Sequence, residues 1–207
     1  MTQKRQNSKD DTPVAPSEIN ADEYCLDAYS LSAHIRNGAV GILATDTLYG
    51  LVGSAFFPDV VARIFQLKRR NINKPVIVLV SDVEQMKYFG VELTRDVLRA
   101  LQTYWPGRYS IVLPTKEDKK FDYLTRGTGT IAFRMPDRAD LFELLDLAGP
   151  IVAPSANTEG DPPATTIAEA HAYFGDNVDF YADAGKIEGK ASTVITFEDG
   201  EVKYLRN

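Results

Sequence analysis

One segment of the chain constrains its fold more than any other: an apolar run, 39–44, that stops abruptly at a polar cluster. The run is long enough for one buried strand, and the sequence Thr-Asp-Thr-Leu-Tyr (45–49) follows it directly. Gly50 then permits a tight turn or a close approach of the backbone to a ligand. In open α/β sheets, small-molecule sites lie beyond the carboxyl ends of such strands. The segment therefore indicates either the mouth of a small-molecule site or a turn with capping residues.

Helical and strand-like patterns alternate along the rest of the chain. Helices are expected over residues 23–36, 59–68, 94–104, 137–147 and 166–174. Strands are expected over residues 39–44, 76–80, 109–114, 130–135, 150–153, 178–182, 193–197 and 202–205. Capping boxes at Ser81–Glu84 and Thr166–Glu169 each begin a helix, and Asp199-Gly200 joins the last two strands in a hairpin. The alternation predicts an α+β (mixed α/β) fold with a mixed sheet flanked by helices.

The length and composition suit a single domain. Of the 207 residues, 44% are apolar, which is enough for a sizeable core. Residues 1–22 are rich in small polar and charged residues and are predicted to form a disordered tail, so the folded domain spans 23–207. The tail lacks the apolar stretch of a signal peptide, and no run of apolar residues is long enough to span a membrane. These features predict a soluble, cytoplasmic protein without a membrane partner.

Charge and cysteine content exclude several function classes. The single cysteine, Cys25, permits neither an intrachain disulfide nor a cysteine-based metal cluster. The net charge of −6 argues against a protein that coats nucleic acid through bulk electrostatics, although a local basic patch is compatible with it. The two histidines, His34 and His171, lie far apart with no Glu or Cys at ligand spacing. The sequence also contains no P-loop motif, so a nucleotide would be held in another way.

A basic cluster lies at residues 68–75, between an expected helix and an expected strand. It places four cations within seven positions: Lys68, Arg69, Arg70 and Lys74. One interpretation is that these cations pair with the carboxyl end of the helix. Four cations exceed what capping needs, and arginine is suited to bidentate contacts with phosphate. The cluster therefore favours an anion site.

Two further regions and one strand position carry polar side chains that a site can use. Ser155 and Asn157 follow a short apolar strand in a loop of small residues, which lets backbone N–H groups face a ligand. An ordinary strand-to-loop turn is the alternative there. Arg134 lies within a strand pattern and needs a partner, either a structural carboxylate or an anionic ligand. Ser192 and Arg206, near the end of the chain, complete the set.

The order of these motifs along the chain carries a family resemblance. The matching segments are Thr45-Asp46-Thr47-Leu48-Tyr49-Gly50-Leu51, Lys68-x-Arg70, Trp105-Pro106-Gly107, Arg134-x-Pro136, Pro154-Ser155-Ala156-Asn157, Ser192-Thr193-Val194 and Arg206. Over roughly residues 30–206 the chain resembles the YrdC-like family of L-threonylcarbamoyladenylate synthases. The resemblance implies a twisted sheet with helices around a concave, positively charged cavity.

The resemblance also implies a reaction. Members of the family combine L-threonine, bicarbonate and ATP to give threonylcarbamoyl-AMP and pyrophosphate. That product supplies the threonylcarbamoyl group for an adenosine of certain tRNAs, so a tRNA threonylcarbamoyl-transferase machinery is the implied downstream partner. The carbamate of threonine attacks the α-phosphate, and the protein needs no nucleophile of its own. Its task is to align two anions and to neutralise phosphate charge.

Roles follow for the residues that match the family's motifs. The implied threonine contacts are Thr45, Arg134 and Ser192. The implied ATP contacts are Lys68, Arg70, Thr130, Ser155, Asn157 and Arg206. Lys68 and Arg70 are the implied catalytic pair, because they neutralise the phosphates. The resemblance also implies a Mg²⁺ ion that bridges phosphate oxygens, and the lack of a dedicated metal cage in the sequence fits an ion held mainly by the substrate phosphates.

Several positions depart from the family's pattern, and they leave two other functions open. Ala44 stands where proline is usual, Lys74 replaces a frequent asparagine, and Leu79 replaces a histidine common in members that contact threonine. One alternative is a module that binds double-stranded RNA or tRNA without turnover. The other is a divergent carbamoyl-transfer paralogue that acts on a different acceptor.

Overall fold

The computed structural model describes residues 27–71, 76–116, 119–198 and 201–206. The predicted tail 1–22, Cys25, Lys74 and the turn 199–200 lie outside the described residues. The helices are α1 (Ala28–Arg36), α2 (Pro58–Leu67), α3 (Arg95–Tyr104), α4 (Asp122–Thr125), α5 (Ala139–Ala148) and α6 (Ile167–Phe174), with short 3-10 helices η2 (Val83–Phe89), η3 (Lys119–Phe121) and η4 (Gly175–Asn177). The strands are β1 (Gly41–Ala44), β2 (Tyr49–Ser54), β3 (Ile77–Leu79), β4 (Tyr109–Pro114), β5 (Thr130–Arg134), β6 (Ile151–Val152), β7 (Phe180–Ala182), β8 (Thr193–Glu198) and β9 (Glu201–Arg206).

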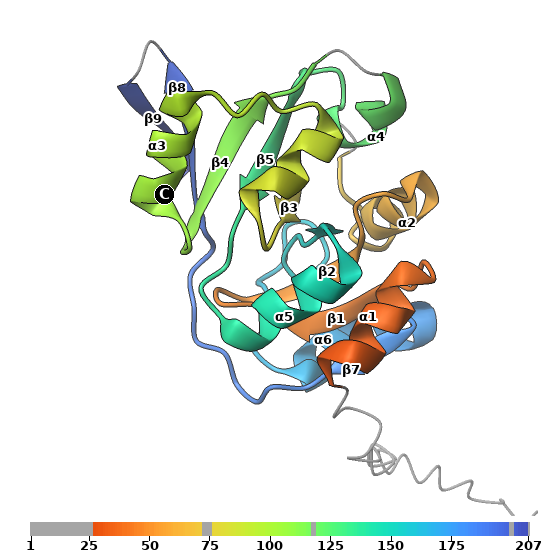
Figure 1. The fold of residues 1–207 in the computed structure, drawn as a ribbon. Coiled ribbons are helices and arrows are strands. Elements are labelled where there is room, and N and C mark those ends of the chain that lie inside the picture. The colour runs from red at the N-terminus through yellow and green to blue at the C-terminus, as the bar shows by residue number, and fades with distance from the viewer. Residues whose placement is uncertain (1–26, 72–75, 117–118, 199–200, 207) are drawn as a thin grey trace, which may run out of the picture.

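The strands form one nine-stranded sheet in the order β7-β1-β2-β6-β3-β5-β4-β8-β9 (Figure 1). Three neighbouring pairs are parallel: β1 with β7, β3 with β5, and β4 with β8. The other pairs are antiparallel, including the closing hairpin of β8 and β9. The mixed sheet flanked by helices that the sequence predicts is confirmed. Among the described residues, no helix is both long and apolar enough to cross a membrane.

Helix starts follow local capping chemistry, with one correction to the sequence-based expectation. The cap at Thr166 is confirmed, because the Thr166 hydroxyl accepts a hydrogen bond from the Glu169 N–H at 3.2 Å. The other half of the box differs, because the Glu169 carboxylate accepts from the Thr165 N–H at 2.7 Å instead of from that of Thr166. The box predicted at Ser81 is wrong in its cap. The Asp82 carboxylate accepts from the Glu84 N–H at 2.8 Å, and the element that follows is a 3-10 helix. The Ser81 hydroxyl instead accepts from the Gln85 side-chain amide at 3.0 Å, so Asp82 is the cap.

Strand β2 (Tyr49–Ser54) is a correction, because the sequence predicts no strand directly after residues 39–44 and only a turn or the mouth of a site beyond them. The chain instead turns tightly at 45–48, where the Thr45 N–H donates to the Leu48 carbonyl at 3.0 Å, and it returns antiparallel to β1. Gly50 therefore lies within a strand, bridged to Ser155. Gly53 is also required, since a Cβ there would lie 2.4 Å from Cγ1 of Val60 on α2. Because glycine has a low strand propensity, Gly50 and Gly53 make this strand hard to predict from the sequence, and its formation depends on tertiary packing.

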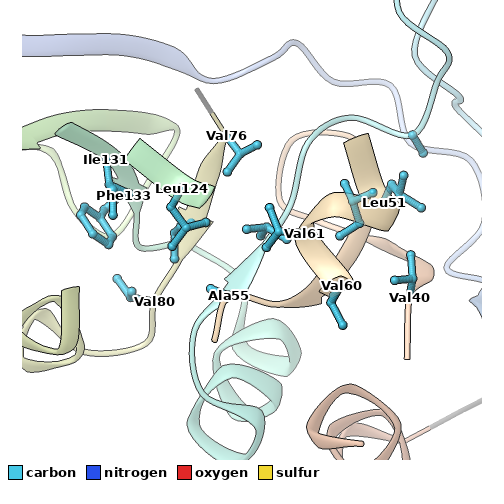
Figure 2. Close-up of a cluster of buried hydrophobic side chains, with 14 of the residues drawn as sticks. Val40, Leu51, Ala55, Val60, Val61, Val76, Val80, Leu124, Ile131 and Phe133 are labelled. Atoms are coloured by element: carbon cyan, nitrogen blue, oxygen red, sulfur yellow. The ribbon is translucent and has the colours of Figure 1, made fainter. Parts of the chain in front are cut away.

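Two apolar clusters cover opposite faces of the β7-β1-β2-β6 half of the sheet. Helices α1 and α5 lie side by side on one face, where Leu31, Leu145 and Val52 are buried (Figure 1). Helices α2 and α6 pack on the other face through the larger cluster, which continues under β3, β5 and β4. Figure 2 shows part of this cluster, from Val60 to Ile131. Val61 and Phe133 belong to this continuous core.

The other half of the sheet has two unlike faces, and this difference positions the site. On β5, Ile131 and Phe133 point into the larger cluster, whereas Ala132 and Arg134 point to the opposite face. The same alternation on β4 sends Val112 to that opposite face. Because the side chains there are small or polar, they leave a hollow where the other half of the sheet is covered by α1 and α5.

Candidate active site

The hollow is a cavity of about 310 Å³. Its floor is formed by Val112, Ala132 and Val194 from three neighbouring strands. The turn 45–48, the loop 153–155 and the end of β9 form its walls. Three arginines line it: Arg70, Arg134 and Arg206. Among the described residues, no Asp or Glu lines it. The cavity is therefore suited to an anionic ligand.

The turn 45–48 forms one end of the cavity, and its conformation depends on Thr45. The Thr45 hydroxyl donates to the Leu48 carbonyl at 2.7 Å and accepts from the N–H groups of Thr47 and Leu48 at 3.2 and 3.1 Å. Its oxygen also lies 3.0 Å from the Thr47 hydroxyl. Thr45 thus lines the cavity while its hydroxyl holds the turn. The predicted contact between Thr45 and threonine stays a prediction.

The connector between β7 and β8 passes directly over this turn. A Cβ at Gly189 would lie 1.8 Å from the Thr47 carbonyl oxygen and 2.9 Å from its carbon, both of which are backbone atoms. We expect Gly189→Ala to displace the turn and to lower the free energy of unfolding by about 1–3 kcal/mol, measured by urea denaturation. Lys190→Ala, at the exposed neighbouring position, is the control. A Gly189→Ala protein as stable as the control would contradict this contact.

Arg134 is almost fully buried, at 3% exposure, and is held by the same turn. Its guanidinium forms an ion pair with Asp46, and a second nitrogen lies 3.4 Å from the Thr47 hydroxyl. Asp46 in turn accepts from the Asp137 N–H at 3.2 Å. The Nε of Arg134 is buried and has no hydrogen-bond partner among the described residues. Burial lowers the pKa of Arg134, and the adjacent Asp46 carboxylate opposes that shift.

Lys68 lies behind the cavity wall and is 1% exposed. Its ammonium group donates to the Ser155 carbonyl at 2.5 Å, the Asn157 carbonyl at 2.8 Å and the Asn157 side-chain oxygen at 3.1 Å. Three donors therefore meet three acceptors, and Lys68 holds the loop that carries Ser155. Burial, with the neighbouring Arg70 charge, lowers the pKa of Lys68 to about 8. Its predicted contact with ATP stays a prediction.

Ser155 and Asn157 are joined within the same loop. The Ser155 hydroxyl donates to the Asn157 side-chain oxygen at 2.6 Å. The Asn157 amide nitrogen donates to the carbonyls of Thr158 and Asp161 at 2.9 and 2.8 Å. Ser155 lines the cavity, whereas Asn157 is buried beneath it and supports the loop.

Arg70 and Arg206 line the cavity although they lie far apart in the sequence. Burial lowers the pKa of Arg70, and the charge of Arg206 adds to that effect, so the two guanidinium groups act on a common region. The pairing of β8 with β9 shifts between Val194, which lies opposite Arg206, and Ile195, which lies opposite Tyr204. Leu205 is therefore an extra, bulged residue of β9, and both Leu205 and Arg206 line the cavity. Arg206 donates to the Ser192 carbonyl at 2.8 Å, which fixes its position.

Of the remaining predicted site residues, Ser192 lines the cavity and Thr130 does not. Ser192 lines it, and its hydroxyl lies 2.8 Å from that of Ser110, a partner that sequence reasoning missed. Thr130 begins β5 on the cavity face but is not among the lining residues, and its hydroxyl lies 3.0 Å from that of Thr128. Ala44 and Leu79 are buried in the apolar clusters and do not line the cavity.

Comparison with known proteins identifies the family. The model of the Sua5/YciO/YrdC domain, described under the heading telomere recombination, matches residues 33–207. The chain belongs to this family. The resemblance drawn from the sequence motifs is thereby confirmed. Among curated members, the chain is 34% identical over 176 residues to a putative threonylcarbamoyl-AMP synthase of Mycobacterium tuberculosis, covering 83% of this chain and 79% of that protein.

Solved structures of the family agree with the fold. The Sua5 protein of Pyrococcus abyssi, crystallised with L-threonine, superposes with a TM-score of 0.78 at 30% identity, covering 87% of this chain. This chain spans only about half (54%) of that longer protein. Escherichia coli YciO superposes with a TM-score of 0.76 at 21% identity, with 86% of this chain and 87% of that chain covered, and it supports the fold alone.

Proposed function

We propose that the protein is an L-threonylcarbamoyladenylate synthase, which forms threonylcarbamoyl-AMP and pyrophosphate from L-threonine, bicarbonate and ATP. The observation that carries the proposal is the convergence of Arg70, Arg134 and Arg206 on one cavity that has no carboxylate among its described lining residues. Such a cavity suits two anionic substrates held together. The curated relatives named threonylcarbamoyl-AMP synthases and the threonine-bound Pyrococcus abyssi structure support the same function.

The turn 45–48 and Arg134 form the end that we assign to threonine. Arg134 is held rigidly by Asp46, so its guanidinium presents a fixed cation to a carboxylate. The hydroxyl groups of Thr47 and Ser192, which both belong to lining residues, offer donors and acceptors for the polar groups of the amino acid. The end that we assign to ATP holds Arg70, Arg206 and the Ser155 loop.

The chemistry asks the protein for alignment and charge neutralisation. The threonine amine combines with bicarbonate to give a carbamate, and water leaves. A carbamate oxygen then attacks the α-phosphate, the bond from that phosphorus to the bridging oxygen breaks, and pyrophosphate leaves with the electron pair. Arg70 and Arg206 neutralise the charge on the phosphates as it redistributes. A protein nucleophile is not needed in this sequence of steps.

Magnesium enters this proposal with the nucleotide. Among the described residues, no group of three or more His, Cys, Asp or Glu side chains is arranged to hold a metal ion. The side chains therefore do not fit a resident Mg²⁺ site. We propose that the substrate is MgATP, with its ion held by phosphate oxygens, and that the product passes to a tRNA threonylcarbamoyl-transferase machinery.

A pyrophosphate-release assay tests the proposed function. With ATP, Mg²⁺, bicarbonate and L-threonine, we expect pyrophosphate to form and threonylcarbamoyl-AMP to appear by mass spectrometry. Omitting threonine should abolish both signals. Pyrophosphate that forms equally without threonine would point to a different acceptor, as in a carbamoyl-transfer paralogue. No turnover, together with salt-sensitive binding of duplex RNA, would instead favour the RNA-binding alternative.

A further inference from the structure

The loop that carries Ser155 is fastened to the end of α2 by hydrogen bonds in both directions. Lys68 donates its three ammonium hydrogens to Ser155 and Asn157. In return, the Glu159 N–H donates to the Lys68 carbonyl at 2.8 Å, and the Glu159 carboxylate accepts from the Asn71 N–H at 2.7 Å. A partly buried carboxylate is thus fixed beside the basic cluster.

Two cations and one carboxylate lie at this junction, and each cation interacts with that carboxylate. Lys68 faces the like charge of Arg70 and the opposite charge of Glu159. Arg70 faces Glu159 and, across the cavity, Arg206. Glu159 is therefore the negative charge that both buried cations share. Without that charge, the like charge of Arg70 on the desolvated ammonium of Lys68 would lack this compensation.

We propose that Glu159 is a positioning residue that keeps Lys68 protonated to higher pH, and through Lys68 keeps the Ser155 loop in place against the cavity. The role in turnover rests on the proposed function, whereas the role in holding the proton on Lys68 does not. A neutral Lys68 has two N–H donors for three acceptors, so one of its bonds to Ser155 or Asn157 is lost. Glu159 also lowers the net positive charge that the phosphates of ATP meet.

These contacts determine how the bond between Lys68 and the Ser155 loop depends on pH. Lys68 has a pKa of about 8, so it is charged below that pH and loses its proton as the pH rises through it. The Glu159 carboxylate raises the pKa of Lys68. Removing the carboxylate charge therefore brings the loss of the proton, and of the loop contact, to a lower pH.

Glu159→Gln tests the proposal, because the glutamine oxygen still accepts from the Asn71 N–H while the charge is lost. We expect ¹³C NMR of the lysine ε-carbons, with the Lys68 signal assigned by its absence in Lys68→Arg, to show the titration midpoint of Lys68 lowered by about half a pH unit or more. Asp161→Asn, which neutralises a carboxylate two residues away in the same loop, should leave the midpoint unchanged. An unchanged midpoint in Glu159→Gln would overturn the proposal, whether or not the protein turns over threonine.

Turnover gives a second readout, in which Glu159→Gln should improve ATP binding at pH 7 and impair activity at pH 9. At pH 7, Glu159→Gln should lower the KM for ATP two- to fivefold, because one negative charge beside the phosphates is gone. At pH 9, its kcat/KM should fall below that of the wild type. A merely structural role would lower activity at both pH values, and that outcome would overturn the positioning role. If the wild type shows no threonine-dependent turnover, the proposed function is wrong, and the NMR titration alone decides the role of Glu159.

Discussion

Replacing Arg70 by alanine is expected to lower kcat/KM for ATP by about 10²–10³-fold while the protein stays folded. Arg70 lines the cavity, and its guanidinium lies 6.0 Å from the centre of the Phe65 ring. Its charge acts on the same region as that of Arg206, so its loss removes a cation that neutralises the phosphates. The measurement is steady-state pyrophosphate release, with circular dichroism to verify the fold.

The neighbouring arginine provides a matched control for Arg70. Arg69 belongs to the same basic cluster but is exposed and is not among the lining residues of the cavity. We expect Arg69→Ala to change kcat/KM less than about threefold. Arg70→Lys should restore only part of the activity, because a lysine ammonium lacks the bidentate geometry of guanidinium. Near-normal activity of Arg70→Ala would show that the phosphates bind elsewhere.

Replacing Asp46 by alanine is expected to lower the free energy of unfolding by about 3–5 kcal/mol. The side chains of Asp46 and Arg134 are only 6% and 3% exposed, so the variant leaves a buried guanidinium without its counter-charge. The Asp137 N–H also loses its acceptor. Urea denaturation measures the effect, and threonine binding by calorimetry should weaken in parallel because Arg134 is no longer held.

A control at an exposed ion pair and a double variant test whether the loss of stability in Asp46→Ala comes from leaving the buried Arg134 without its counter-charge. Glu198 and Lys203 form a pair whose side chains are 60% and 58% exposed, and Glu198→Ala should cost less than about 1 kcal/mol. Asp46→Leu combined with Arg134→Met removes both buried charges and should be more stable than Asp46→Ala. Equal losses in Asp46→Ala and Glu198→Ala would mean that burial of the Asp46 pair adds nothing.

The fold was predictable wherever apolar periodicity is strong. The bounds of β4 match the expected residues 109–114, and Thr166 caps α6 as its sequence pattern indicates. Strand β2 was not predictable, because its glycines have low strand propensity and its first residues look like a loop. The need for Gly53 becomes visible only when Val60 is placed 2.4 Å from its missing Cβ.

The candidate site was predictable in its residues but not in its connections. Arg134 was expected to need a partner, yet only the fold shows that the partner is Asp46, 88 positions earlier. Lys68 is predicted to contact the phosphates, but only the structure shows that its side chain is buried and bonded to Ser155 and Asn157. A row of cations in a sequence carries no information about which of them faces solvent. Glu159 gave no signal, because a lone carboxylate in a polar loop is ordinary.

The bulge that brings Arg206 to the cavity lies in β9, which ends the strand order of the sheet and is largely exposed. Strands at such edges open in local fluctuations that require much less free energy than unfolding of the core. We therefore expect this wall of the cavity to open locally while the rest of the sheet stays intact. As a result, hydrogen exchange at β9 reports on the integrity of this wall, whereas the melting temperature reports on the core.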